Sequence, residues 1–386
     1  MTEHATVSSA RDKLLFTPGP LTTSASVKAA MLHDAGSWHF EFNDIVKRIR
    51  ERLLDVAGVS REAGWETVLL QGSGTFGVEA VFLTCVPPRG KVLVLANGAD
   101  GEHMAQMLAH ASISFETVRW AEDCPVDAAT VDAALAGDPD ITHVAVVHCE
   151  TTTGILNPID EVGSIVKRRG KVFIVDAMSS FGGIPIDLEA CRIDFLVSSS
   201  NKCIEGVPGF CFVICRREAL LACEGFARSL SLDLLAQLNG FEKNGQFRFT
   251  PPTHALLAFD RALSELEAEG GVRGRNARYC ANHAALIAGM AGLGFEPFLR
   301  PDVQSCIITA FAYPSADTFE FSRFYRELSD RGFIIYPGKL TEVDTFRVGN
   351  IGRLFAQDIQ QLVLAIGAVC KEMGVSSEIA DWSARP

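Results

Sequence analysis

Between residues 66 and 215 the sequence repeats one pattern: a short apolar run, a turn of glycine or polar residues, and usually a helical segment. The apolar runs are continuous rather than alternating, which is typical of strands buried on both faces of a sheet. Helices between such strands predict parallel crossover connections. The pattern therefore predicts a doubly wound, mainly parallel α/β sheet. Its expected strands are ETVLLQ, KVLVLAN, THVAVVHC, KVFIVDAM, DFLVSSS and FCFVICRR.

The pattern changes after about residue 253. Helical segments are followed there by short apolar runs and by a last helix near 356–373, which predicts a smaller α+β domain. A chain of 386 residues is long enough for two domains of ordinary size. We expect an N-terminal arm over 1–20, a large α/β domain over 21–265, a small C-terminal domain over 270–375 and a tail over 376–386.

Charge and cysteine content restrict the partners and the compartment. A formal net charge of −12 argues against a nucleic-acid-binding surface, which needs a basic patch, and disfavours attraction to anionic lipid. The N-terminus lacks the apolar core of a signal peptide, and no apolar run approaches the ~20 residues that span a bilayer. The eleven cysteines show no paired metal spacing, and several lie inside apolar runs. We expect a soluble cytoplasmic protein that binds no metal, nucleic acid or membrane.

Polar residues gather directly after the expected strands. In open α/β sheets, ligands bind beyond the carboxyl ends of the strands, so these turns should converge on one cleft. They offer an anion-binding turn, the isolated carboxylate of Asp176, a group of threonines and a single lysine, Lys202. The turns are QGSGT (71–75), NGADG (97–101), HCETTTG (148–154), DAMSS (176–180) and SSNK (199–202).

Three of these groups together indicate pyridoxal phosphate. Backbone N–H groups at a helix start, with the hydroxyls of Ser73 and Thr75, suit one phosphate group. A lysine such as Lys202 can form a Schiff base with the cofactor aldehyde, and a carboxylate such as Asp176 can keep the pyridine nitrogen protonated. Each group alone has an ordinary explanation, such as a solvated loop lysine or a helix-capping aspartate. Their combination in this order is what points to the cofactor.

A nicotinamide cofactor is the competing interpretation. Gly72, Gly74 and Gly77 match G-x-G-x-x-G, which is the dinucleotide-binding fingerprint when it follows a strand and opens a helix. That fingerprint also needs an acidic residue at the end of the next strand. The run KVLVLA is followed by Asn97 instead, and Asp100 comes three residues after that asparagine. This interpretation leaves the lysine and the carboxylate without a role and is the least favoured.

Longer stretches resemble the class V, fold-type I aminotransferases, and among them the 2-aminoethylphosphonate–pyruvate aminotransferases. The resemblance covers about residues 13–365 in matching order and spacing. It implies a homodimer with its active sites at the interface, pyridoxal phosphate as cofactor, and transfer of the amino group of 2-aminoethylphosphonate to pyruvate. The stretches that carry it are LLFTPGPLTTSASVKAAM, VLLQGSGTFGVEAV, VVHCETTTGILNPIDEVG, FIVDAMSSFGGIPID, SSNKCIEGVPGFCFVI, RSLSLDL, RFTPPTH and FRVGNIG.

The resemblance also implies roles for single residues. Lys202 would bond to the cofactor and then carry protons, and Asp176 would pair with the ring nitrogen. Arg347 would bind the acid group of the substrate, with the N–H of Gly19 beside it. The other expected cofactor contacts are Ser73, Gly74 and Thr75 at the phosphate, Ser199, Thr253 at the phosphate of the neighbouring subunit, and Thr152 near the phenolic oxygen, with Thr151 and Thr153 as rivals.

Three places depart from the pattern of this family. Asp100 stands where an aromatic residue usually stacks on the cofactor, His103 stands where an arginine is usual, and HFEF (39–42) replaces an acidic run after Trp38. We expect the Asp100 side chain to turn away from the ring and to cap the helix that starts near Glu102. These departures leave two alternatives open. One is the same machinery with another small amino donor, such as a substituted aminophosphonate or an ω-amino acid, and the other is a binding protein without turnover.

Overall fold

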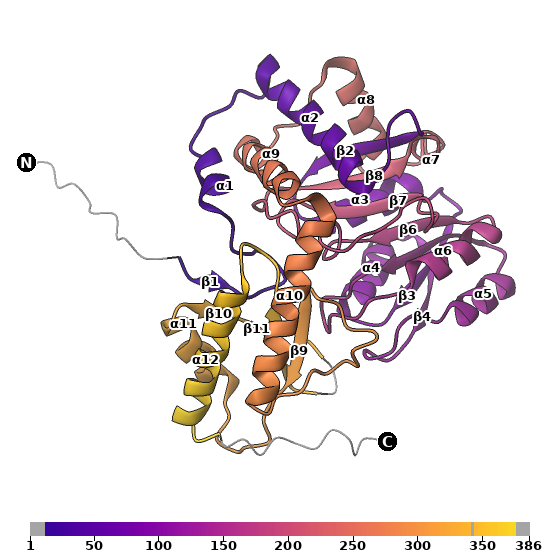
Figure 1. Cartoon of the computed structure of the whole chain (residues 1–386). Helices are drawn as coiled ribbons and strands as arrows, with labels where there is room; N and C mark the ends of the chain where they lie inside the picture. Colours follow the sequence, from indigo (N-terminus) through magenta and orange to yellow (C-terminus); the bar gives the residue numbers. More distant parts are fainter. Residues whose placement is uncertain (1–11, 341–342, 376–386) are drawn as a thin grey trace, which may run out of the picture.

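The computed structural model describes residues 12–340 and 343–375. Its larger part is built around a seven-stranded sheet with helices packed on it (Figure 1). The strand order is β2-β8-β7-β6-β5-β3-β4, and β8 alone runs antiparallel to its neighbours β2 and β7. The remaining pairs are parallel. This confirms the mainly parallel sheet. Its strands are β2 (Trp65–Gln71), β3 (Lys91–Ala96), β4 (Ser114–Arg119), β5 (Ile141–Val147), β6 (Val172–Asp176), β7 (Phe195–Ser199) and β8 (Phe210–Arg216).

Helices follow most of the strands and pack on the sheet. For example, α3 packs against β7 and β8, α4 packs against β3, and α6 packs against β6. One continuous apolar core runs through this layer, with the Val, Leu and Ile side chains of the central strands fully buried. The helices of this part are α1 (Ala25–Ala30), α2 (Phe40–Ala57), α3 (Gly74–Cys85), α4 (Ala99–His110), α5 (Ala128–Gly137), α6 (Ile159–Arg168), α7 (Arg217–Leu221), α8 (Leu234–Asn244) and α9 (Thr253–Ala268).

The edge strand β4 is missing from the strands expected from the sequence. Among the described residues it pairs with β3 alone, and its residues are half-buried or exposed along its whole length. An edge strand with a solvated side needs no continuous apolar run, and SFETVR has none. The signal used for the central strands therefore does not detect it.

A second, smaller group of elements has its own apolar core. A three-stranded antiparallel sheet of order β11-β12-β9 lies with α10, α11 and α12 (Figure 1). The short strand β1 pairs in parallel with β10, so the segment just before TPGP is attached to this C-terminal group. The elements are β1 (Leu14–Leu15), α10 (Gly271–Gly292), β9 (Ile308–Ala312), α11 (Phe321–Asp330), β10 (Phe333–Ile334), β11 (Tyr336–Pro337), β12 (Thr345–Gly349) and α12 (Ala356–Glu372).

The predicted domain limits of 21–265 and 270–375 stay predictions. The first part of the expected arm and the whole expected tail, 376–386, lie outside the described residues. Within the described residues, no helix has the length and apolar character needed to cross a bilayer, and no cluster of three or more His, Cys, Asp or Glu side chains could hold a metal ion.

Candidate active site

A cavity of about 220 Å³ lies at the carboxyl ends of the central strands. The turns after β2, β3, β5, β6 and β7 all contribute to its wall, which confirms that the polar strand ends converge. The residues that line it include Ser73, Gly74, Thr75, Asp100, His103, Cys149, Thr151, Asp176, Met178, Ser179, Ser199, Asn201 and Lys202.

Lys202 enters the cavity from the loop after β7. Its Nζ donates a hydrogen bond to the carbonyl of Pro18 at 2.9 Å. Gly19 packs directly against this side chain, because a Cβ added there would lie 2.8 Å from Lys202 Cδ. Burial lowers the pKa of the Lys202 amine, and the carboxylate of Asp100 opposes this shift. The TPGP segment therefore holds the lysine beside the cavity, in surroundings that favour its neutral form.

Asp176 is the last residue of β6, and only 8% of its surface is exposed. One of its carboxylate oxygens accepts the backbone N–H of Met178 at 2.9 Å. Burial raises the pKa of Asp176 to about 7, and the negative charge of Asp100 adds to this effect. A buried carboxyl with this pKa is suited to share a proton with a ring nitrogen.

The N-terminus of α3 supplies the expected anion-binding turn. Ser73 directly precedes the helix, Gly74 begins it, and the first N–H groups of a helix are available to an anion. Gly74 has a packing role too, because a Cβ added there would lie 2.1 Å from the sulfur of Met178. Gly72 donates its N–H to the Gly209 carbonyl at 3.0 Å, which ties this turn to the loop beyond Lys202.

The expectation for Asp100 is wrong. Its carboxylate lines the cavity instead of turning away, and it accepts hydrogen bonds from the hydroxyl and from the backbone N–H of Thr151, the latter at 3.1 Å. It does not cap its helix either. The helix α4 already begins at Ala99, and the carboxylate of Glu150 accepts the N–H groups of Asp100 at 3.1 Å and Gly101 at 3.3 Å. A carboxylate from another strand end has therefore taken the capping position.

Glu150 was not identified from the sequence. It is fully buried, and burial together with the charge of Asp100 raises its pKa well above the usual range. It also accepts the hydroxyl of Thr152 at 2.8 Å, and the same hydroxyl accepts the N–H of Ala99 at 3.0 Å. Thr152 is thus engaged with the start of α4, whereas Thr151 lines the cavity. Of the three threonines, Thr151 is the better candidate for contact with a cofactor.

Arg347, on β12, is joined to the cavity wall through Thr151. The Thr151 carbonyl accepts a hydrogen bond from Arg347 Nη1 at 2.7 Å, and the Pro337 carbonyl accepts one from Nε at 2.9 Å. The side chain is 2% exposed, and burial lowers the pKa of its guanidinium, while the carboxylate of Asp100 opposes this shift. Two backbone carbonyls therefore fix the plane of this cation near the cavity.

The other expected residues are divided between the cavity and its surroundings. Ser199 lines the cavity and its hydroxyl donates to the side-chain oxygen of Asn201 at 3.0 Å. Thr253 is the first residue of α9 and does not line the cavity of its own chain. Trp38 and Phe40 are 77% and 66% exposed and lie outside the cavity wall, whereas His103 is part of it.

Replacing Asp100 with asparagine is expected to make Asp176 titrate at lower pH. The change removes a nearby negative charge that raises the Asp176 pKa, and it keeps an oxygen that can accept from Thr151. Carboxyl titration of the cofactor-free protein by carbon NMR would measure the effect, with Asp176→Asn used to assign the signal. An unchanged midpoint would show that the two carboxylates do not interact.

The cavity suits pyridoxal phosphate on its own evidence. The Ser179 hydroxyl is buried in the cavity wall and has no hydrogen-bond partner within residues 12–340 and 343–375. A buried polar atom without a partner points to a group that is bound there. The wall also combines a helix N-terminus for an anion, a buried carboxyl and a lysine amine, which are the three groups that this cofactor needs.

Comparisons with known proteins agree with this geometry. Among solved structures, the chain is similar to pyridoxamine-pyruvate aminotransferase from Mesorhizobium loti, with a TM-score of 0.84 and 24% identity over 97% of this chain and 94% of that one. It is also similar to ureidoglycine-glyoxylate aminotransferase from Bacillus subtilis, with a TM-score of 0.86 and 20% identity over 96% of both chains. At these identities the matches show the fold alone, and they confirm the fold-type I architecture.

Sequence comparisons reach further. A curated 2-aminoethylphosphonate–pyruvate transaminase from Salmonella heidelberg (strain SL476) is 52% identical over 358 residues, which are 92% of this chain and 97% of that protein. A transaminase of the same name from Phocaeicola vulgatus is 49% identical over 363 residues, which are 94% of this chain and 100% of that protein. The profile of the family described as aminotransferase class-V matches residues 22–338. The chain therefore belongs to the class V aminotransferase family.

Proposed function

We propose that this protein is a pyridoxal-phosphate-dependent aminotransferase that moves the amino group of 2-aminoethylphosphonate to pyruvate, giving phosphonoacetaldehyde and L-alanine. One observation carries the proposal: a single cavity joins Lys202, Asp176 and the N-terminus of α3, and Thr151 links its wall to Arg347. The two curated transaminases named above support the choice of substrates, because they match this chain over nearly its whole length.

The cofactor would be held by residues from two strand ends. Ser73, Gly74 and Thr75 would bind its phosphate, and Asp176 would hold a proton on its ring nitrogen. Pyridoxal phosphate supplies an aldehyde that bonds to amines and a ring that accepts electrons from the bond being broken.

Lys202 has two tasks in this proposal. Its amine would bond to the cofactor between turnovers, and Nζ would then take the proton from the carbon that carries the donor's amino group. Both tasks need a neutral amine, and burial lowers the pKa of Lys202 in that direction. The contact of Nζ with the Pro18 carbonyl shows that the amine reaches the N-terminal segment across the cavity edge.

Arg347 would bind the acid groups of both substrates in turn. A guanidinium presents a planar pair of donors that matches phosphonate oxygens or a carboxylate equally well. The bonds to the carbonyls of Thr151 and Pro337 already fix its orientation before a substrate arrives. Because the donor and the acceptor use the same cavity in alternate half-reactions, one arginine is sufficient for both.

Arg347→Ala is expected to raise the KM of both 2-aminoethylphosphonate and pyruvate by about 10²-fold, which is typical for loss of one partner of a partly buried charge pair. Steady-state kinetics with each substrate varied in turn would measure this. Arg331→Ala is the control, because Arg331 pairs with Glu327 and Glu372 on the surface. An increase for only one of the two substrates would contradict the shared-site arrangement.

The donor itself is tested by a panel of amines with pyruvate as acceptor, scored by the alanine formed. Alanine from 2-aminoethylphosphonate, with phosphonoacetaldehyde as co-product, supports the proposal. Alanine from only a substituted aminophosphonate or an ω-amino acid would support the alternative donor. Cofactor binding without alanine from any donor would instead support a binding protein that kept the fold.

We further propose a homodimer in which Thr253 reaches the phosphate of the neighbouring subunit. Phe76 follows the phosphate-binding turn directly and is 49% exposed, and Phe249 is 44% exposed. The side chain of Gln71 donates to the carbonyls of Phe249 and Thr250, so this apolar surface lies beside the turn. Exposed apolar side chains of this size favour a covered interface. A solution mass of one chain with full activity would contradict the proposal.

The proposed location is the cytoplasm. All eleven cysteines are unpaired, which is typical of a reducing compartment.

Cys203, beside the lysine, is fully buried, and its Sγ donates a hydrogen bond to the Ser179 carbonyl at 3.2 Å. These contacts fit a packing role for this cysteine.

A further inference from the structure

A cluster of buried charged side chains lies behind Lys202, outside the cavity. We call it the α10 cluster, and it consists of Glu205, Glu269, Arg275, Arg278 and Tyr279. Arg275 and Tyr279 are fully buried, and Glu205 is 1% exposed. Burying these charges removes them from water, and this desolvation costs free energy that the ion pairs offset only in part. Stability alone is therefore a weak explanation for the cluster.

One side of the α10 cluster holds the loop that follows Lys202. Arg278 Nη2 donates to the Glu205 carboxylate at 2.6 Å, and the Tyr279 hydroxyl donates to the same oxygen at 2.8 Å. Arg275 donates to the carbonyl of Cys203, the residue next to the lysine. Glu205 itself has a φ of +67°, a left-handed conformation that side chains rarely adopt. These hydrogen bonds hold the loop in that conformation.

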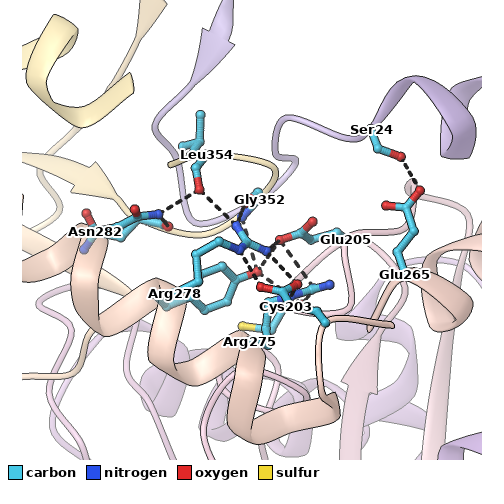
Figure 2. Close-up of polar contacts among 12 residues, drawn as sticks. Ser24, Cys203, Glu205, Glu265, Arg275, Arg278, Asn282, Gly352 and Leu354 are labelled. Carbon is cyan, nitrogen blue, oxygen red and sulfur yellow. Dashed lines mark hydrogen bonds and ion pairs between the residues drawn. The ribbon is translucent and has the colours of Figure 1, made fainter. Parts of the chain in front are cut away.

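The other side holds the loop that follows Arg347. Arg278 Nη1 donates to the carbonyls of Gly352 at 2.6 Å and Leu354 at 3.0 Å, as Figure 2 shows. Asn282, one turn further along α10, donates to the carbonyls of Leu354 at 2.9 Å and Asn350 at 3.3 Å. The segment directly after β12, which carries Arg347, is therefore fixed to the same face of α10 as the Lys202 loop.

Arg278 contacts both loops through one guanidinium, and the Tyr279 hydroxyl also reaches both, because it accepts the N–H of Gly352 at 3.3 Å. Arg275 reaches only the Lys202 side, through Cys203 and Glu205. Asn282 reaches only the Arg347 side. Because the guanidinium is planar and rigid, its two ends keep a fixed separation, which a flexible lysine would not provide.

We propose that Arg278 is a positioning residue that sets the separation between Lys202 and Arg347, and that it thereby selects the chain length of the amino donor. The inference rests on the aminotransferase function proposed above. The reacting amine must lie at Lys202 while the acid group of the same molecule lies at Arg347. A donor with one methylene more or fewer fits only if that separation changes, and a rigid site discriminates one methylene by about 10- to 200-fold.

Exchange measurements on the cofactor-free protein test the mechanical part of this inference. In Arg278→Gln, amide hydrogen exchange is expected to rise in both 203–206 and 350–354, because one side chain holds both loops. In Arg275→Gln it is expected to rise in 203–206 only. Increased exchange in a single loop of the Arg278 variant would overturn the inference, whatever the protein catalyses.

Selectivity tests the functional part. The quantity is the ratio of kcat/KM for 2-aminoethylphosphonate to that for 3-aminopropylphosphonate, with pyruvate as acceptor. Arg278→Gln is expected to lower this ratio at least about fivefold, from a wild-type value within the 10- to 200-fold range of a one-methylene difference. If that variant does not fold, Arg278→Lys replaces it, because it keeps the charge but loses the fixed separation.

The matched control is Arg50→Gln. Arg50 is also buried and pairs with Glu66 at 2.9 Å, and it lies on α2, away from both loops. Its loss should lower the melting temperature without changing the selectivity ratio. A folded Arg278 variant with the wild-type ratio would overturn the inference. Wild-type protein that turns over neither phosphonate would instead overturn the proposed function, while the exchange result would still decide the link between the loops.

Discussion

Replacing Lys202 with alanine is expected to abolish transamination and to leave the fold intact. Lys202 is the one lysine in the wall of the described cavity, so no neighbouring amine can bond to the cofactor in its place. The same residue would also move the proton, and a general base alone contributes up to about 10⁴-fold to a rate. We therefore expect a loss of at least about 10⁴-fold, because both contributions disappear together.

Three measurements separate this result from misfolding. Alanine formation reports turnover, thermal unfolding reports the fold, and the visible spectrum reports whether the cofactor is bonded to a lysine. Lys47→Ala is the control, because Lys47 is exposed on α2 and pairs only weakly with Glu51 at 3.9 Å. Turnover near the wild-type rate in the Lys202 variant would refute the pyridoxal-phosphate mechanism for this chain.

Asp176→Asn is expected to retain the cofactor but to lower kcat by about 10²- to 10³-fold, which is typical for loss of one strong electrostatic contact in an active site. The phosphate turn at Ser73–Thr75 is unchanged, so binding should persist. A neutral amide cannot hold a proton on the ring nitrogen by its charge, so the ring accepts electrons less readily. Equilibrium binding and kcat, measured on the same preparation, would show the two effects separately.

The same substitution changes how stability depends on pH in the cofactor-free protein. The folded pKa of Asp176, about 7, lies above that of an unfolded aspartate, so the folded state binds this proton more tightly. The free energy of unfolding of the wild-type protein should therefore fall by about 3 kcal/mol between pH 5 and pH 8, and Asp176→Asn should not show this decrease. Chemical denaturation at the two pH values measures the difference. Parallel pH profiles in the two proteins would show that Asp176 ionises normally.

The sheet could be predicted because strands buried on both faces leave a continuous apolar run in the sequence. The same physical condition explains why β4 was missed, since an edge strand does not need such a run. The meeting of the strand ends followed from topology, because parallel strands end at the same edge of a sheet. The positions of Lys202 and Asp176 in the cavity wall needed no further information.

The roles of Asp100 and Glu150 could not be predicted, because they depend on where α4 begins relative to the end of β5. Glu150 caps that helix from a distant strand end, and this left Asp100 free to bond to Thr151. Three successive threonines give no local signal for which of them faces the cavity. Arg278 lies in a helix whose polar residues look solvent-exposed in the sequence, because the loops that cover it come from residues 203–205 and 350–354.

Because β1 pairs with β10, the lysine environment can be completed only after most of the chain has been synthesised. Residues 14–15 are made first, but their partners are residues 333–334, and the segment between β1 and α1 carries the carbonyl that contacts Lys202. The strands of the seven-stranded sheet end at residue 216 and the last helix of its core ends at residue 268, so this layer can form while the C-terminal elements are still being translated. A nascent or truncated chain that stops before β10 would thus have a folded sheet with its lysine still uncovered. The assembly order of the molecule delays a competent active site until the two distant ends of the chain have met.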